Sequence, residues 1–185
     1  MIDILKDKKV IFFDVGYTLD YPASGDWMFT KKFYEVFGDR LSRYSEAEIQ
    51  KAKEFGLEYL LQNHLVTNTE DEYRQFVRFY SDVFRHLKLE VTDEEVATIA
   101  HDRTNNMDNY IVYPDARNVV QVLSKTHKLG IISDTWPSIE NQLRAIGVRE
   151  YFAACTYSCD LGTFKPAETM YVDALKKVGC KAEDA

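Results

Sequence analysis

The chain has 185 residues, of which 45% are hydrophobic and 29% charged, and its formal net charge is −7. This length fits one domain, or one domain with a sizeable insertion, and the composition is that of an ordinary globular protein. No Lys/Arg cluster indicates nucleic-acid binding, no apolar run reaches the ~18 residues of a membrane-spanning helix, and the N-terminus lacks a signal-peptide pattern. We therefore expect a cytoplasmic protein that binds neither nucleic acid nor membrane.

The first predicted element is a buried strand over residues 10–15. Val10 to Phe13 are apolar and rich in β-branched and aromatic side chains, which is typical of a strand buried on both faces. Asp14 then falls at the carboxyl end, where open parallel α/β sheets bind ligands. Its position alone is compatible with a nucleophile, a metal ligand or a cap of the strand.

Residues 24 to about 110 carry only helical signals. Aromatic and aliphatic residues at helical spacing predict a first helix over 29–37 that ends at Gly38. Capping boxes, in which Ser or Thr precedes Glu by three residues, predict three further helix starts: Ser45 with Glu48, Thr69 with Glu72, and Thr92 with Glu95. We expect a bundle of about four helices whose aromatic stripes form its core.

After Tyr113, helices and strands alternate. The patterns predict a helix around 119–123, the strand "LGIIS" at 129–133, a helix over 139–146, the strand-like "YFAACTYS" and a last helix that ends at Gly179. Such alternation predicts an α/β fold with a parallel sheet, to which the strand at 10–15 also belongs. Residues 1–20 and 111–185 thus form a discontinuous core, and residues 21–110 form a helical insertion.

Three polar residues follow strands or lie in the loop beyond one: Asp14, Ser133 and Lys165, the last within "GTFKP". Each alone is compatible with an ordinary structural role, but together at the ends of strands they favour one site. A carboxylate can attack phosphorus, a hydroxyl with nearby N–H groups can hold the phosphoryl oxygens, and an ammonium can offset their charge. The trio therefore favours phosphoryl transfer.

The segments "IFFDVGYTLD", "LGIISD" and "GTFKP" resemble the first three motifs of the haloacid dehalogenase superfamily of hydrolases. Their order and the helical insertion are similar to the subfamily with a helical cap after the first strand. The resemblance implies a three-layer Rossmann-like parallel-sheet core with an inserted helical-bundle cap. It also implies a Mg²⁺-dependent phosphatase that acts on a small phosphorylated metabolite through an aspartyl-phosphate.

The resemblance assigns roles residue by residue. Asp14 would be the nucleophile and a Mg²⁺ ligand, the main-chain carbonyl of Gly16 a second ligand, and Thr18 would steady the loop. Ser133 and the backbone at Asp134 would bind phosphate. Lys165 would pair with Asp14 and the phosphate. Aromatic residues near the expected pocket, which either line it or pack elsewhere, are candidates for specificity: Tyr21, Trp27 and Trp136.

The sequence departs from the phosphatase pattern at Gly16, where those enzymes carry an acid/base aspartate. Positioned acid–base catalysis contributes roughly 10²- to 10⁴-fold. One alternative is therefore a catalytically impaired, ligand-binding or interaction member of the fold. Another is a hydrolase of C–P or C–halogen bonds in phosphonates or haloacids. Lys51 or Lys53 could supply a Schiff-base amine for phosphonate chemistry, although a solvated helix face explains them better.

The resemblance also places a strand with a fourth, acidic motif after the last helix, beyond residue 185. We therefore expect a core that is truncated at its C-terminal side and a Mg²⁺ site without that motif. The first strand would present an unpaired apolar edge, which is a template for self-association.

Overall fold

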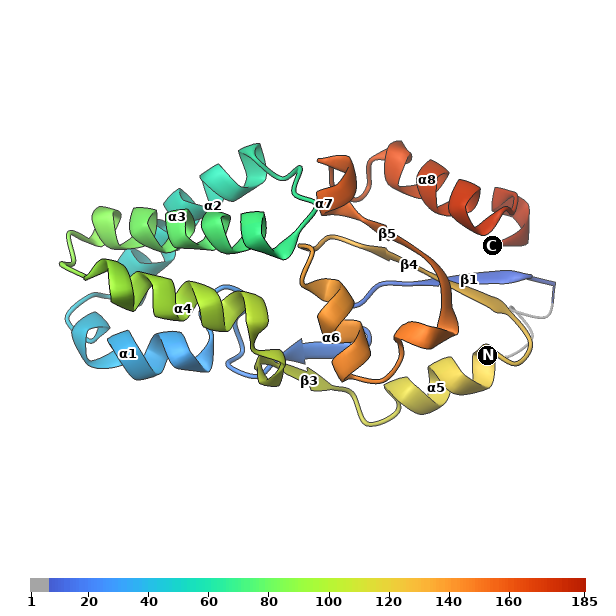
Figure 1. Cartoon of the computed structure of the whole chain (residues 1–185), viewed down its shortest axis with the longest axis horizontal. Coiled ribbons are helices and arrows are strands. Elements are labelled where there is room, and N and C mark those ends of the chain that lie inside the picture. The colour runs from blue at the N-terminus through green and yellow to red at the C-terminus, as the bar shows by residue number, and fades with distance from the viewer. Residues whose placement is uncertain (1–6) are drawn as a thin grey trace.

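The structure, a computed structural model, describes residues 7–185. A bundle of helices occupies one end of an elongated molecule and an α/β core occupies the other (Figure 1). The expected bundle of four helices is confirmed: α1 (Lys31–Leu41), α2 (Glu46–Gln62), α3 (Thr69–Leu87) and α4 (Asp93–Asn105). None of the helices between residues 7 and 185 combines the length and apolar character that crossing a membrane requires.

Two of the three capping boxes are present as expected, at the starts of α2 and α4: Ser45 with Glu48, and Thr92 with Glu95. The third is wrong. Asn68, not Thr69, is the N-cap of α3, and its side chain accepts from the Asp71 amide. The carboxylate of Glu72 is buried and bonds to the α/β core instead. A contact distant in sequence has therefore overridden a local pattern.

The helix α1 also runs past Gly38, where the sequence predicted its end, to Leu41. A glycine inside a helix costs about 0.5–1 kcal/mol. Phe37 and Leu41, on either side of Gly38, are both buried in the bundle, and this burial offsets the cost. The glycine therefore does not end the helix.

The core of the bundle is aromatic, as the stripes predicted. The rings of Phe29 and Phe33 stack with centroids 4.1 Å apart, and Phe33 stacks on Phe84 at 6.0 Å. All three side chains are buried together with Phe37 and Tyr80. These aromatic residues are packing residues of the bundle.

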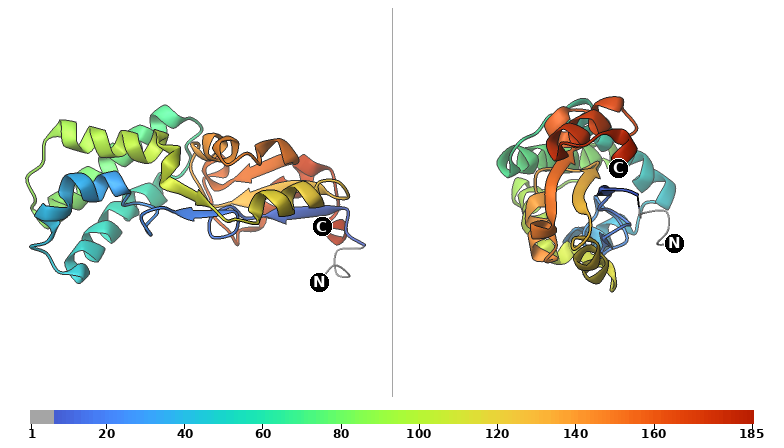
Figure 2. Two further views of the ribbon diagram at one scale, coloured as in Figure 1. Left: turned by 90° about the horizontal axis from the view of Figure 1, so that it is seen from below. Right: turned by 90° about the vertical axis from the view of Figure 1, so that its right-hand side faces the viewer.

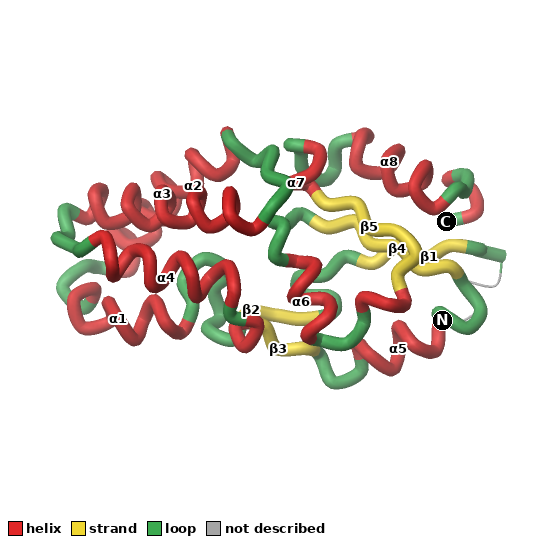
Figure 3. The backbone as a smooth tube through the Cα atoms, viewed as in Figure 1, coloured by secondary structure: helices red, strands yellow, loops and turns green. Residues whose placement is uncertain are grey.

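The sheet of the α/β core contains β1 (Val10–Phe13), β4 (Lys128–Ser133) and β5 (Phe152–Tyr157) in the order β1-β4-β5 (Figure 3). All neighbours are parallel, which confirms the predicted sheet. The register pairs Phe12 with Gly130. A Cβ at Gly130 would lie 2.6 Å from the Phe12 ring, so only glycine permits this close approach.

Helices cover both faces of this sheet, which gives three layers (Figure 2). Leu129 and Ile131 pack with α5 (Ala116–Leu123) and α6 (Ile139–Ala145) on one face. Ile132 packs with Met170 of α8 (Glu168–Val178) on the other. The α8 helix ends at Gly179, its C-cap, as predicted, and this glycine has a left-handed conformation. The remaining short helices are α7 (Ser158–Leu161), η2 (Met107–Asn109), η3 (Arg149–Tyr151) and η4 (Ala182–Asp184).

Two short strands that the sequence analysis did not find join the bundle to the core. β2 (Asp20–Pro22) and β3 (Tyr110–Val112) pair antiparallel and form a ribbon. The chain passes through β2 from the core to the bundle and returns through β3. The predicted boundaries at 20/21 and 110/111 fall within this ribbon. The assignment of 1–20 and 111–185 as one domain and 21–110 as another stays a prediction, and its first six residues lie outside the described part of the chain.

A second connection lies on the opposite side of the molecule, between the end of α2 and the start of α3 (Figure 1). The Val66 amide donates to the Cys159 carbonyl at 2.9 Å. The imidazole Nε2 of buried His64 lies 2.6 Å from Ser158 Oγ. The bundle therefore contacts the core on both sides.

Candidate active site

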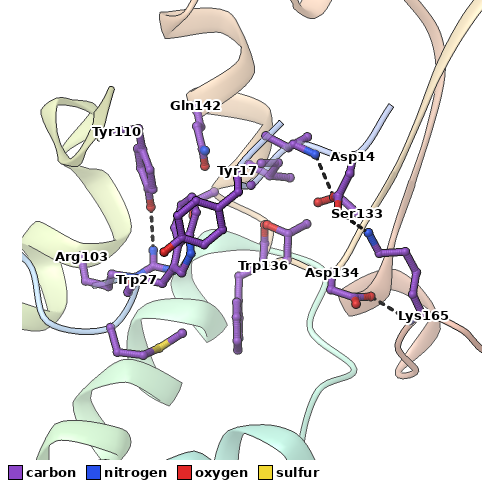
Figure 4. Close-up of a pocket in the computed structure, with 16 residues that line it drawn as sticks. Asp14, Tyr17, Trp27, Arg103, Tyr110, Ser133, Asp134, Trp136, Gln142 and Lys165 are labelled. Atoms are coloured by element: carbon purple, nitrogen blue, oxygen red, sulfur yellow. Dashed lines mark hydrogen bonds and ion pairs between the residues drawn. The ribbon is translucent and has the colours of Figure 1, made fainter. Parts of the chain in front are cut away.

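A pocket of about 290 Å³ lies between the bundle and the carboxyl ends of the core strands (Figure 4). Seven of the residues singled out from the sequence line it: Asp14, Gly16, Trp27, Ser133, Asp134, Trp136 and Lys165. Two others do not. Tyr21 packs against Tyr113 in the ribbon with ring centroids 4.9 Å apart. Thr18 is exposed in the turn after Asp14, where its amide donates to the Val15 carbonyl at 3.0 Å.

Asp14 and Lys165 form the centre of the site. The Lys165 ammonium lies 2.6 Å from Asp14 Oδ2 and 3.3 Å from the Ile132 carbonyl. The other carboxylate oxygen of Asp14 accepts from the Val15 amide at 2.8 Å. The Asp14 side chain is 42% exposed, so this paired carboxylate remains accessible from the pocket.

Ser133 and Asp134 follow from the end of β4, the neighbour of β1. The Ser133 hydroxyl makes no hydrogen bond within residues 7–185, and it lines the pocket. It is therefore available to a ligand. Asp134 Oδ1 accepts from the Lys165 amide at 2.9 Å. This bond fixes the loop that carries the lysine, a role for the Asp134 side chain that the sequence analysis did not assign.

Trp27 covers the backbone at Gly16. A Cβ at Gly16 would lie 3.1 Å from the Trp27 ring. Tyr17, the next residue, has a left-handed backbone with φ of 56°, and its ring meets Trp27 edge-on at 5.3 Å. The turn after Asp14 thus presents an aromatic surface to the pocket.

Arg103 forms the far wall of the pocket and was missed by the sequence analysis. Its Nε donates to the Trp27 carbonyl and its Nη1 to the Tyr110 hydroxyl, both at 2.8 Å. Its guanidinium lies over the Phe76 ring, 4.6 Å from the centroid. The sequence contains a signal for it. Arg103 occupies the same helical face as buried Val96, Ile99 and Ala100, where an apolar residue would be usual.

The buried carboxylate of Glu72 lies behind this wall. It accepts from the Ser138 amide and hydroxyl, each at 2.7 Å, and lies 3.9 Å from Arg103 Nη1. Burial raises the pKa of Glu72, whereas Arg103 and the two Ser138 hydrogen bonds lower it. These donors hold an acidic side chain in the interior between bundle and core.

Asp20 is a second buried carboxyl group close to the site. Gln142, which lines the pocket, donates its side-chain amide to Asp20 Oδ2, while Oδ1 is buried with no partner in residues 7–185. Burial raises the pKa of Asp20 to about 6, with a smaller contribution from the charge of Asp14. Asp20 does not itself line the pocket.

The two lysines considered for Schiff-base chemistry lie outside this pocket. The Lys53 ammonium pairs with the carboxylate of Asp26. Lys51 lines a surface depression beside Tyr44 and His86. Neither amine reaches the walls that Asp14 and Lys165 share.

The donors available to a metal ion are few. Within residues 7–185 no three His, Cys, Asp or Glu side chains gather into a metal-binding group. Asp14 is accessible, and no hydrogen bond within the described residues engages the Gly16 carbonyl. Mg²⁺ commonly uses one or two carboxylates, with phosphate and water as its other ligands. An ion in this pocket would have these two oxygens as its protein ligands, and other groups would have to complete its coordination.

Comparisons with known proteins find relatives of this chain. A family model described as haloacid dehalogenase-like hydrolase matches residues 8–185, and no curated protein sequence matches the chain. Among solved structures, a 2-haloacid dehalogenase from Pseudomonas syringae pv. Tomato DC3000 gives a TM-score of 0.61 at 18% identity, over 96% of this chain and 76% of that one.

Two further solved structures are similar. The HAD-hydrolase YfnB from Bacillus subtilis, bound to magnesium, gives a TM-score of 0.62 at 15% identity, over 91% of this chain and 73% of that one. A HAD phosphatase from Thermococcus onnurineus gives 0.53 at 21% identity, over 94% and 73%. At these identities the similarity shows the shared fold.

Proposed function

The chain belongs to the haloacid dehalogenase-like hydrolases, and on that premise we propose that it is a phosphatase of a small phosphorylated metabolite. The observation that supports this most directly is the 2.6 Å pair of Asp14 and Lys165 at the ends of the strands. The hydroxyl of Ser133, which has no hydrogen-bond partner among the described residues, lies on the same pocket wall. A nucleophilic carboxylate, a cation and a hydroxyl donor are the groups that phosphoryl transfer needs.

In this proposal Asp14 attacks the phosphorus atom and forms an aspartyl-phosphate as the bond to the leaving group breaks. Lys165 offsets the charge on the carboxylate and on the transferred group, and the Ser133 hydroxyl donates to a phosphoryl oxygen. Asp134 keeps Lys165 in place through the 2.9 Å bond to its amide. Water then attacks the phosphorus and the Asp14 carboxylate is regenerated.

Mg²⁺ belongs to the proposal as well. Asp14 and the carbonyl of Gly16 would hold it, and the ion would neutralise charge on the phosphate. The helical bundle would act as the cap that selects substrates, since it supplies Trp27 and Arg103 to the pocket. Location in the cytoplasm is part of the same proposal.

The test is phosphate release from a panel of small phosphate esters with and without Mg²⁺. Asp14→Asn should abolish turnover without changing the fold, because the amide is nearly the same shape but is not a nucleophile. Asp115→Asn is the matched control, because Asp115 is exposed and its side chain caps no helix. Wild-type turnover by Asp14→Asn would contradict the assignment of the nucleophile.

Hydrolysis of a carbon–halogen bond is the second candidate. Gly16 favours it, since halide leaves as an anion and needs no proton from an acid. Halide release from 2-haloacids, with no phosphate release from the ester panel, would replace the first proposal by this one. Binding of phosphate esters without release of either product would indicate the impaired, ligand-binding alternative.

A further inference from the structure

The Trp27 ring crowds the space that a side chain at position 16 would need. Gly16 lies two residues after Asp14, on the pocket wall. A Cβ there would lie 3.1 Å from Cζ2 and 3.5 Å from Cη2 of the Trp27 ring. The first distance is already tighter than an ordinary contact. An aspartate at position 16 would therefore fit only if the indole shifted by a few tenths of an ångström.

The Trp27 ring is held in this position from several sides. Its carbonyl accepts from Arg103 Nε at 2.8 Å, which fixes the backbone. Its ring meets Tyr17 edge-on at 5.3 Å and lies 6.1 Å from the ring of Tyr110 (Figure 4). Just before it, Asp26 accepts from the Met28 amide at 2.7 Å. Displacing the indole would disturb its contacts with the rings of Tyr17 and Tyr110.

Two carboxyl groups line the described pocket, those of Asp14 and Asp134, and both contact Lys165. Asp14 is paired with Lys165, and Asp134 accepts from the Lys165 amide. The acid of Asp20 lies behind the pocket wall.

The other proton donors of the pocket wall include two phenols, those of Tyr17 and Tyr110. Burial raises the pKa of Tyr110 still further above the usual value of about 10. A general acid works best when its pKa lies near the working pH, so phenols are poorly matched to this task.

We propose that Trp27 determines specificity by excluding a general acid, and that the natural substrates carry a leaving group that departs as a stable anion. Aryl and acyl phosphates form this class, whereas alkyl phosphates do not. The inference rests on the proposed phosphatase function and narrows its substrate. The indole itself would pack against the departing group.

The reaction balances without a proton donor in its first step. An oxygen of Asp14 forms a bond to phosphorus while the bond from phosphorus to the leaving oxygen breaks, and that oxygen keeps the electron pair. In the second step water adds to phosphorus, Asp14 recovers its electron pair, and the proton of water goes to solvent. The second step lacks a general base, so the phosphoenzyme should accumulate.

The experiment compares 4-nitrophenyl phosphate with benzyl phosphate, which has similar size but an alkoxide leaving group. For the wild type we expect kcat/KM to be at least about 10²-fold lower for benzyl phosphate, the range of a missing general acid. We also expect a burst of 4-nitrophenol that approaches one equivalent per enzyme. Neither measurement requires a variant.

Three variants isolate the role of Trp27. In Gly16→Asp alone the carboxyl group is crowded by Trp27, and Trp27→Ala alone has no acid at position 16, so neither variant should raise kcat/KM for benzyl phosphate. The double variant has both the acid and the space for it, and should raise kcat/KM for benzyl phosphate about 10-fold or more relative to 4-nitrophenyl phosphate. Circular dichroism and a thermal melt check that each variant is folded.

Several results would overturn the inference. Equal kcat/KM for the two esters in the wild type would show that a proton donor is present. A selective loss of benzyl phosphate turnover in Tyr17→Phe would identify Tyr17 as that donor. An improvement in Gly16→Asp alone equal to that of the double variant would show that Trp27 excludes nothing. Lack of phosphate release from either ester would overturn the phosphatase proposal itself, and this inference with it.

Discussion

The carboxylate of Glu72, on α3 of the bundle, accepts from both the amide and the hydroxyl of Ser138, which precedes α6 of the core. Glu72 is fully buried and is also the nearest acidic group to the buried guanidinium of Arg103, at 3.9 Å. The Glu72 carboxylate therefore accepts hydrogen bonds at the start of a core helix and also balances the charge of Arg103 on the pocket wall. Substitution of Glu72 therefore tests the contact between bundle and core.

We expect Glu72→Gln to lower the free energy of unfolding by about 2–4 kcal/mol, because Arg103 would remain buried without an opposite charge. Glu70→Gln is the control on the same helix. Its exposed pair with Arg74 at 3.1 Å should contribute at most about 0.5 kcal/mol. Urea denaturation of both variants makes the comparison, and equal losses would contradict this role of Glu72.

The raised pKa of Asp20 predicts a pH dependence of stability. The folded chain holds this proton up to about pH 6, whereas an unfolded chain loses it near 3.9. Between these values the folded state binds more protons, so the free energy of unfolding should fall as pH rises. Asp20→Asn cannot ionise. Its stability relative to wild type should therefore increase from pH 4 to pH 7.5, by up to about 3 kcal/mol.

Asp115→Asn, an exposed substitution, should show no such trend. Urea denaturation at the two pH values gives the difference. The absolute effect of Asp20→Asn also includes the changed contact with Gln142, so the change with pH is the informative quantity. A constant difference between wild type and Asp20→Asn would contradict the buried, titrating carboxyl group.

His64 should act in the opposite direction. Burial lowers its pKa to about 4, whereas an unfolded histidine titrates near 6.5. Over this range the unfolded state binds more protons, so stability is lost as pH falls from about 6.5 towards 4. His64→Gln should remove this loss, and should become more stable relative to wild type at pH 4.5 than at pH 7.5.

The effects of Asp20 and His64 partly cancel in the wild type, since their pH ranges overlap. Asp20→Asn should therefore show a steeper loss of stability in acid than wild type, and His64→Gln a shallower one. The control is His86→Gln, because His86 is exposed beside the Phe55 ring. If the pH dependence of stability changed in the same direction in Asp20→Asn and His64→Gln, the raised pKa of Asp20 and the lowered pKa of His64 would be contradicted.

Self-association through β1 is the fourth prediction. Among the described strands, β1 pairs with β4 alone, so its other edge is open. We expect the 185-residue chain to associate as its concentration rises, and the amides of residues 10–13 to exchange more slowly with deuterium as it does. The amides of β4, a central strand, serve as the internal control. A monomer by sedimentation at all concentrations, with unchanged exchange in β1, would contradict the prediction.

The sequence could predict those parts of the fold that depend on local patterns. The strand ends at Asp14 and Ser133 are visible as apolar runs that stop at a polar residue. The ribbon was not visible, because β2 and β3 have three residues each and pair across about ninety residues of chain. The capping box predicted at Thr69 is wrong for a related reason, because the hydrogen-bond partner of Glu72 lies 66 residues away in the sequence.

The candidate site could likewise be predicted only in part from the sequence. Asp14, Ser133 and Lys165 could be named because the topology of a parallel sheet brings strand ends together. The effect of Trp27 on Gly16 could not, because it depends on how the segment before α1 folds back over the turn. The sequence shows that an acid is missing, whereas the structure shows what fills its place.

The left-handed backbone of Tyr17 has a consequence for engineering. A tyrosine in this conformation costs about 1–2 kcal/mol that a glycine would not. The residue is 63% exposed, so burial of its side chain recovers little of that energy. A library screened only for heat resistance should therefore enrich glycine at position 17, whereas a library screened for turnover should keep the aromatic ring. The two enrichments would separate what this turn needs for folding from what it needs for catalysis.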